Sequence, residues 1–274
     1  KKLPSVINLD GRVGSYELRE LFPELTKIFD NPKPKQILSQ LTSLTTDLDS
    51  VILDFFGGSG TTAEAVMRLN AEDGGNRQFI LVQIPQPIDA KKQKDAHKFV
   101  TETLGKPEAT IFEITAERIR RAGAKINAEK PDVDTGFRVF ELVDDPDALI
   151  LQKPLQEATQ ADLAALQVSI ATPQPDQLPR VLHNLLLAEQ LPLTTVLHTL
   201  KADHLYQGAN PLKIVSPVLL AELADTLRTL QASATPVVYL TVYAPWIDDD
   251  NFMLGIKTLA ESLGYSEDKL RLRG

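Results

Sequence analysis

The sequence predicts an α/β protein with two domains, in which a strand, a glycine-rich loop, a helix and a second strand follow one another early in the chain. The run Val51–Phe56 is almost wholly apolar, as in parallel strands that are buried on both faces. Glycines follow it directly, residues 63–70 have a helical pattern, and Phe79–Gln83 is a second apolar strand. This order predicts a βαβ unit with parallel strands and a right-handed crossover.

The elements before this unit are helices joined by a proline-rich turn. Helical spacing predicts helices at 16–22 and 34–44. Between them, the segment Asn31–Lys35 contains two prolines, which fix φ and favour an extended turn.

The elements after this unit divide between the two domains, which we expect to meet near residue 145. The first domain, 1–144, ends with predicted helices at 91–103 and 115–128 and a strand at 137–142. In the second, smaller α/β domain, 145–274, we predict a helix at 181–190, a strand at 212–215, a helix opening at Ser216–Pro217, a strand at 237–243 and a helix at 252–263.

Composition excludes several classes of protein. The 274 residues, 43% hydrophobic and 24% charged, are ordinary for a globular chain. The absence of cysteine excludes disulfides and a cysteine nucleophile. A net charge of −8 excludes holding nucleic acid by bulk positive charge alone. No apolar run approaches the ~20 residues of a membrane span, so no membrane partner is expected.

The glycine loop is the clearest candidate for a binding site. Gly57, Gly58 and Gly60 follow a strand, where they permit a sharp turn and the close approach of a ligand to the backbone. Thr61 and Thr62 begin the next helix, whose N-terminus favours a carboxylate or phosphate. A tight turn without a ligand is the alternative interpretation.

The loop alone does not identify its ligand. It lacks the Gly-Lys-Ser/Thr of a P-loop, whereas residues 58–63 fit the dinucleotide pattern G-x-G-x-x-A. That pattern, like an S-adenosylmethionine site, expects an acidic residue at the end of the second strand, where this chain has Gln83. A glutamine can still hydrogen-bond a ribose, but without a charge.

The combination of motifs is more specific. The segments Phe29–Pro34, Asp54–Thr62 and Asn76–Gln83, in this order, resemble the cofactor-binding half of β-class DNA amino-methyltransferases. They are most similar to the modification (Mod) subunits of type III restriction–modification systems, and the stretches 117–122 and 134–140 look like the same family. The resemblance implies an incomplete Rossmann-like, S-adenosylmethionine-dependent methyltransferase sheet. It implies these cofactor-binding residues: Phe29, Asn31, Pro32, Lys33, Pro34, Asp54, Phe55, Phe56, Gly57, Gly58, Ser59, Gly60, Thr61, Thr62 and Gln83.

Within that interpretation the residue types suit the cofactor. The helix N-terminus suits its carboxylate, Asp54 suits its amine, and Phe55 or Phe56 suits its adenine. Core packing is the alternative for the phenylalanines, and we favour it for one of them.

The sequence also lacks a motif that the resemblance implies. These methyltransferases use an Asp/Asn/Ser-Pro-Pro-Tyr/Phe/Trp tetrapeptide to hold the amine of a flipped adenine, and none occurs here. In the β class this tetrapeptide and the target-recognition region come earlier in the chain. Since the sequence also starts without Met, we expect a C-terminal portion of a larger adenine-N6 methyltransferase, with no catalytic residue and no activity of its own.

The resemblance further implies DNA, a second Mod subunit and a restriction (Res) subunit as partners, and a cytoplasmic location. Two other interpretations stay open, an NAD-binding oxidoreductase fragment and a non-catalytic interaction module. We interpret the basic residues Arg118, Arg120, Arg121 and Lys125 as a solvated helix face rather than a phosphate site. The run Asp248–Asp250 is interpreted as helix capping rather than metal binding.

Overall fold

The computed structural model describes residues 6–142, 160, 177–209, 211–234 and 236–273. The chain divides into two compact units, residues 1–137 (unit 1) and residues 138–274 (unit 2). The domain boundary expected near residue 145 lies outside the described residues.

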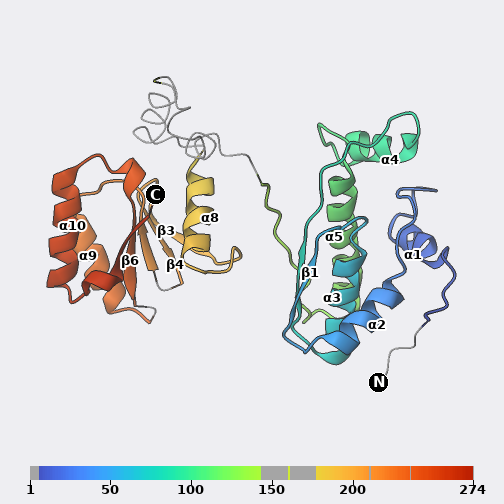
Figure 1. Cartoon of the computed structure of the whole chain (residues 1–274), viewed down its shortest axis with the longest axis horizontal. Coiled ribbons are helices and arrows are strands. Elements are labelled where there is room, and N and C mark those ends of the chain that lie inside the picture. Colours follow the sequence, from blue (N-terminus) through green and yellow to red (C-terminus); the bar gives the residue numbers. More distant parts are fainter. Residues whose placement is uncertain (1–5, 143–159, 161–176, 210, 235, 274) are drawn as a thin grey trace. The chain divides into compact units, whose positions relative to one another are not determined.

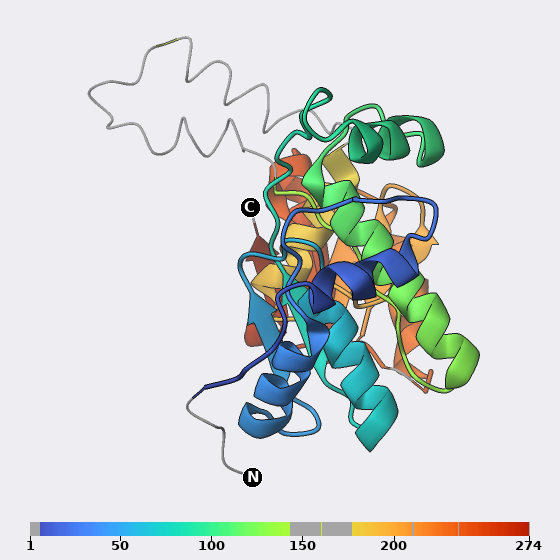
Figure 2. The same ribbon diagram turned by 90° about the vertical axis from the view of Figure 1, so that its right-hand side faces the viewer.

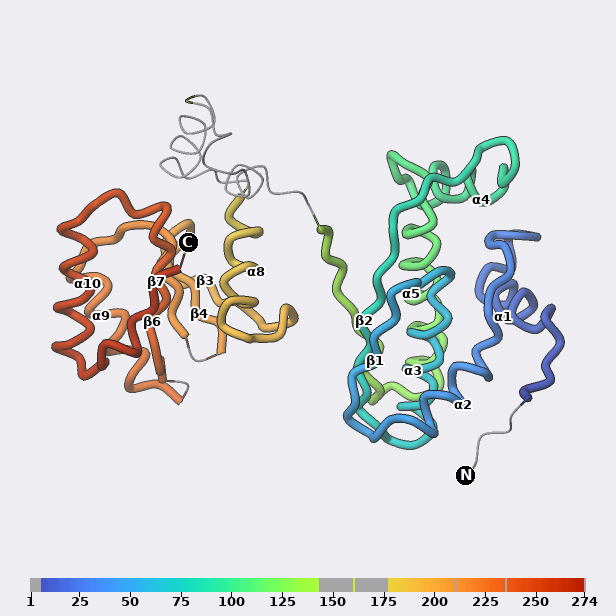
Figure 3. Tube along the Cα trace, in the orientation of Figure 1, coloured from blue at the N-terminus to red at the C-terminus, as the bar shows by residue number. Residues whose placement is uncertain are grey.

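Unit 1 contains the predicted βαβ arrangement. Strands β1 (Val51–Asp54) and β2 (Gln78–Leu81) are parallel, with Val51 opposite Gln78, and helix α3 (Thr61–Asp73) connects them. The two strands run side by side in Figure 3. The other elements of the unit are α1 (Val13–Leu21), α2 (Lys35–Thr45), α4 (Lys94–Lys98), the π-helix η1 (Phe99–Thr103) and α5 (Ile111–Glu129) (Figure 1).

The core of unit 1 lies between the helices and one face of the two strands. Ala63 and Met67 of α3 belong to the same buried cluster as Ile119 and Ala122 of α5. Helix α1 crosses α5, as Figure 2 shows, and Phe22 at its end meets the edge of Phe99 with ring centroids 5.7 Å apart. This packing fixes α3, and with it the end of the glycine loop.

The expectation that these strands are buried on both faces is wrong. Val51 and Leu53 of β1 and Ile80 of β2 are each more than half exposed. The alternate residues Phe79 and Leu81 pack against the core. Among the described residues of unit 1, helices cover one face of the pair only, so alternate side chains are left in solvent.

Unit 2 is a five-stranded sheet with helices on its two faces. The strands lie in the order β3 (Leu197–Lys201), β4 (Leu205–Gly208), β5 (Pro211–Ile214), β6 (Tyr239–Tyr243), β7 (Leu270–Arg273); β5, β6 and β7 are parallel. Helices α9 (Leu220–Gln231) and α10 (Asp250–Ser262) cover one face and α8 (Leu178–Ala188) the other (Figure 1). Short 3₁₀ turns η3 (Ala244–Trp246) and η4 (Glu267–Lys269) precede α10 and β7.

Two predicted elements differ from the structure. Helix α9 begins at Leu220 rather than at Ser216–Pro217, because Val218 is buried in the core and Leu219 is extended. Residues 137–142 are not a strand, since Phe137 packs against the core of unit 1 and the Phe140 ring meets His183 of unit 2. No helix in the described part of the chain is long and apolar enough to cross a membrane.

Candidate functional site

The glycine loop has the backbone conformation that its glycines permit. Gly58 and Gly60 have left-handed φ values of 54° and 81°. Gly60 is the residue that precedes α3, and a β-carbon there would lie 3.1 Å from the Thr115 carbonyl oxygen of α5. The Thr115 hydroxyl donates to the Gly58 carbonyl at 2.5 Å. Strain and contact therefore both require glycine at position 60.

Asp54 stands at the end of β1 with its carboxylate turned toward the loop. Its Oδ1 accepts a hydrogen bond from the Phe56 amide at 2.9 Å, and Oδ2 accepts one from the Thr62 hydroxyl at 2.5 Å. Each carboxylate oxygen has two lone pairs, so both oxygens keep the capacity to accept from a cation. Asp54 thus shapes the loop and also offers it a negative charge.

Gln83 also supports the loop. Its Oε1 accepts from the Gly58 amide at 2.7 Å, and its Nε2 donates to the Ile84 carbonyl at 2.8 Å. This side chain connects the end of β2 to the loop after β1. Gln83 therefore helps to fix the conformation of the glycine loop, in addition to any contact that it makes with a ligand.

Phe29, two residues before the proline-rich segment, lies beside the loop. Phe29 Cζ would be 3.9 Å from a β-carbon at Gly58, so the aromatic ring borders the loop directly. Asn31 is left-handed with φ 53°, and Pro34 precedes α2. Pro32 and Pro34 are buried, whereas Asn31 and Lys33 are exposed.

A close contact with α1 fixes this segment. A β-carbon at Gly14 would lie 2.1 Å from the Pro32 carbonyl oxygen, so the two backbones approach as closely as only glycine allows. Gly14 was not singled out from the sequence, because it lies just before the predicted helix 16–22 and a lone glycine gives no sign of what lies opposite it.

Phe55 and Phe56 are largely exposed, with 64% and 86% of their surfaces accessible. The expectation that one of them packs in the core is therefore wrong. Both lie at the carboxyl end of β1, directly before Gly57. Exposed aromatic rings at this place are available to stack on a planar ligand.

Ser59, Thr61 and Thr62 are buried rather than open to a ligand. The hydroxyls of Ser59 and Thr61 accept hydrogen bonds from Arg118 at 2.7 and 2.6 Å. Arg118 itself is completely buried, so its assignment to a solvated helix face is wrong. Its partner Glu64, one turn into α3, is also buried and was not singled out from the sequence.

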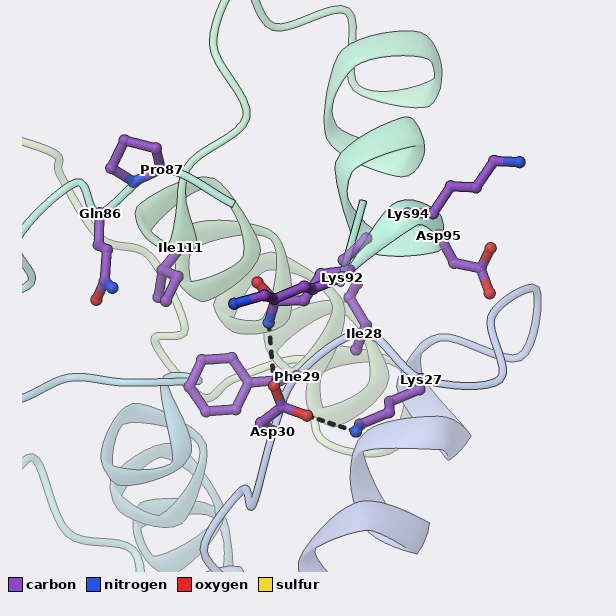
Figure 4. Close-up of a pocket in the computed structure, with 12 residues that line it drawn as sticks. Lys27, Ile28, Phe29, Asp30, Gln86, Pro87, Lys92, Lys94, Asp95 and Ile111 are labelled. Atoms are coloured by element: carbon purple, nitrogen blue, oxygen red, sulfur yellow. Dashed lines mark hydrogen bonds and ion pairs between the residues drawn. The ribbon is translucent and has the colours of Figure 1, made fainter. Parts of the chain in front are cut away.

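A cavity of about 670 Å³ adjoins the same region, and Phe29 lines it (Figure 4). Asp30 is held at its wall by an ion pair to Lys27 and by a hydrogen bond from Gln93 at 3.1 Å. Ile111, Gln86 and Lys92 also line it. None of these lining residues except Phe29 was predicted as a site residue, because they come from separate segments of the chain with no motif in common.

Comparison with known proteins first defines the class. Residues 11–122, which contain the proline-rich segment, the glycine loop and Arg118, match the DNA methylase family. This match and the relatives below support the methyltransferase interpretation and not the oxidoreductase.

The individual relatives point to a narrower group of proteins than the family match does. The type III restriction–modification enzyme EcoP15I Mod subunit of Escherichia coli is 41% identical over 145 residues, 53% of this chain and 20% of that protein. The StyLTI Mod subunit of Salmonella typhimurium is 40% identical over 155 residues, 55% of this chain and 21% of that protein. The type II methyltransferase M.KpnI of Klebsiella pneumoniae is 44% identical over 63 residues, 23% and 15% of the two chains.

The resemblance to type III Mod subunits is thus confirmed over about half of this chain. The chain spans about a fifth of the length of the curated relatives it matches.

Proposed function

We propose that unit 1 forms the S-adenosylmethionine site of a type III Mod subunit that methylates adenine N6 in DNA. The observation that carries this proposal is the meeting of two separate segments at one place. The Phe29 ring, two residues before the proline-rich segment, borders Gly58, so this part of the chain and the glycine loop meet at one place. Both lie inside the match to the DNA methylase family.

The proposed fold of unit 1 is an incomplete Rossmann-like methyltransferase sheet. The parallel pair β1–β2 and its connecting helix α3 support this, since the loop and Gln83 follow the carboxyl ends of the strands, where ligands of such sheets bind. The exposed side chains of Val51, Leu53 and Ile80 suit a sheet that is covered further in the whole protein.

The residues fit the cofactor chemically. A β-carbon at Gly58 would stand between the loop and the Phe29 ring, so glycine keeps that space open. The Asp54 carboxylate suits the ammonium group, and the N-terminus of α3 suits the carboxylate. Exposed Phe55 and Phe56, with Phe29, offer aromatic surfaces for the adenine. Asn31, Lys33 and Gln83 would border the ligand.

S-adenosylmethionine supplies, when bound, a methyl group activated by its sulfonium. This chain's residues would bind and orient it, and the contribution to rate would come from positioning. Holding the flipped adenine belongs to the Pro-Pro tetrapeptide, which these 274 residues lack. We therefore expect the purified chain to transfer no labelled methyl group to DNA.

The proposed partners are DNA, a second Mod subunit and a Res subunit, and unit 2 is the proposed site of subunit interaction. This rests on the relatives, which are Mod subunits of type III restriction–modification enzymes. Sedimentation of the chain alone and with unit 2 removed measures whether residues 138–274 cause self-association.

A calorimetric titration with S-adenosylmethionine, with NAD as the control ligand, tests the site. We expect heat with S-adenosylmethionine only, and none after Gly58→Val. The matched control is Gly74→Val at the other end of α3, where φ is also left-handed (73°) but no atom lies within 4 Å of a β-carbon. Heat with NAD alone, or with neither ligand, would contradict the proposal.

A further inference from the structure

A buried ion pair connects α5 to the first turn of α3. Arg118 Nη2 and Nε lie 3.0 and 3.1 Å from Glu64 Oε2, and the two side chains have 0% and 1% of their surfaces exposed. Burial alone would raise the pKa of Glu64, but Arg118 and Lys35 lower it below its ordinary value of 4.5. Glu64 is therefore a carboxylate and Arg118 a guanidinium.

The guanidinium has a second edge, and this edge points to the glycine loop. Its Nη1 donates to the Ser59 and Thr61 hydroxyls and, at 3.4 Å, to the Ser59 carbonyl. The planar fork of arginine fixes both sets of bonds at once, which a lysine ammonium at the same place cannot do. Arg118 thus ties the loop to two helices.

Glu64 carries the connection further, to the proline-rich segment. Its Oε1 accepts from Arg68 Nε at 3.1 Å and from Lys35 Nζ at 3.4 Å. Lys35 directly follows Pro34, and its backbone amide donates to Glu17 Oε2 of α1 at 2.9 Å. The chain of contacts from Ser59 through Arg118, Glu64 and Lys35 therefore joins the two segments that form the proposed site.

Stability alone does not account for this arrangement. Removing two charges from water is costly, and replacing a buried ion pair by apolar residues of similar volume is often neutral or stabilising. An apolar pair, however, offers no donor to Ser59 and Thr61 and no acceptor to Lys35. The charged pair adds hydrogen bonds that hold Ser59 and Thr61 of the loop in register with Lys35 of the proline-rich segment.

We infer that Arg118, through Glu64, is a positioning residue that sets the glycine loop and the Asn31–Lys35 segment in their ligand-binding arrangement before the ligand arrives. The inference rests on the proposed function for the identity of the ligand. The arrangement of the two segments does not depend on the proposed function, because it can be measured without a ligand.

The experiment separates positioning from stability with two variants of the full chain. Glu64→Gln/Arg118→Met removes both charges, leaves no unpaired buried charge, and keeps an amide oxygen for Lys35. Arg118→Lys keeps an ion pair with Glu64 but gives up the planar fork. Lys213→Met, which breaks a buried ion pair in unit 2, is the matched control. Urea unfolding, S-adenosylmethionine calorimetry and amide hydrogen exchange are measured for each.

We expect both unit 1 variants to unfold close to wild type but to bind S-adenosylmethionine about ten- to a hundredfold more weakly. That range corresponds to losing one charge-assisted hydrogen bond. The amides of residues 57–62 and those of Asn31, Lys33 and Lys35 should exchange faster in both variants, while Lys213→Met leaves binding and these amides unchanged.

Wild-type affinity together with wild-type exchange in the double variant would overturn the inference, since Arg118 would then serve stability alone. If the wild-type chain binds no S-adenosylmethionine, the proposed function fails instead. The exchange of the same amides still decides the inference in that case, because faster exchange in both segments supports it and unchanged exchange overturns it.

Discussion

Both units contain an ion pair between fully buried side chains, and the two pairs have different surroundings. In unit 1, Arg118 and Glu64 direct their remaining hydrogen bonds to a loop and to Lys35. In unit 2, Lys213 Nζ lies 2.6 Å from Glu189 Oε2, and the other Glu189 oxygen accepts from the Thr241 hydroxyl. Thr241 lies directly opposite Lys213 on the neighbouring strand.

The difference shows what a buried ion pair does in each place. Lys213 and Thr241 belong to strands already held by a ladder of backbone hydrogen bonds, so Glu189 only joins the end of α8 to a formed sheet. Burial lowers the pKa of Lys213, against the opposing effect of Glu189. Ser59 and Thr61 belong to a loop with no such ladder, so there the pair defines a conformation.

The largest expected effects on stability come from replacing the cationic member of each buried ion pair by an apolar residue. Lys213→Met should lower the free energy of unfolding of unit 2 by about 3–5 kcal/mol, because it takes the ion-pair partner Lys213 from the buried Glu189 carboxylate. Arg118→Met should lower that of unit 1 by less, because Arg68 and Lys35 still pair with Glu64. Trp246, the single tryptophan of the sequence, is buried in unit 2 and reports that unit by fluorescence during urea unfolding.

Lys213→Met should therefore shift the fluorescence transition to lower urea. Arg118→Met should leave the fluorescence transition in place and shift only the unfolding of the unit 1 helices, measured by circular dichroism. A fluorescence transition that moves equally in both variants would show that the units do not respond separately, and the comparison would fail.

A smaller effect is expected where α1 meets the proline-rich segment. Gly14→Ala places a β-carbon 2.1 Å from the Pro32 carbonyl oxygen, so one backbone must move. We expect a loss of about 1–3 kcal/mol of unfolding free energy and weaker S-adenosylmethionine binding. Gly11→Ala is the control, since nothing lies within 4 Å of its β-carbon. Equal binding by both variants would show that the segment's position does not matter.

Acid should affect the pair in unit 1 through Glu64. Its pKa is lowered in the folded chain, so its contribution to stability is present above its ordinary pKa of 4.5 and is lost as the pH falls through the folded value. Protonation of Glu64 then lowers the free energy of unfolding by at most about 1.4 kcal/mol per pH unit. Urea unfolding of wild type and Glu64→Gln between about pH 6 and pH 3 measures this. Parallel curves would contradict it.

Sequence patterns predicted the elements of the site better than its contacts. The spacing of Ile37, Leu38 and Leu41 gave α2, and the apolar run with its glycines gave β1, the loop and α3. Chemistry that depends on a neighbour distant in sequence was not predictable. Arg118 is 54 residues from Glu64, and its spacing with Arg121 and Lys125 is equally that of a solvated face.

Prediction from the sequence has the same limit in unit 2. The parallel strands β5 and β6 were predicted from apolar runs, but β3, β4 and β7 were missed, because each mixes polar and apolar residues in only four or five positions. Their pairing is set by neighbouring strands rather than by local pattern. The short loop between β3 and β4 was also hard to read, since its left-handed residue is Asp203 and not glycine.

The smallest expected effect is at a local contact that the sequence did predict. Asp249 precedes α10, and its Oδ1 accepts from the amides of Asn251 and Phe252 at 2.9 and 3.1 Å, which confirms the capping interpretation of the acidic run. Asp249→Ala should lower the free energy of unfolding by about 1 kcal/mol, read from Trp246 fluorescence. Asp248→Ala, one residue earlier, is the control and should change little. If the two substitutions had equal effects, the run would act through its total charge, and the cap would not be a separate contribution. An unequal result would show that a local hydrogen-bonded cap stabilises unit 2 on its own, whereas Arg118 in unit 1 acts between segments that are distant in sequence.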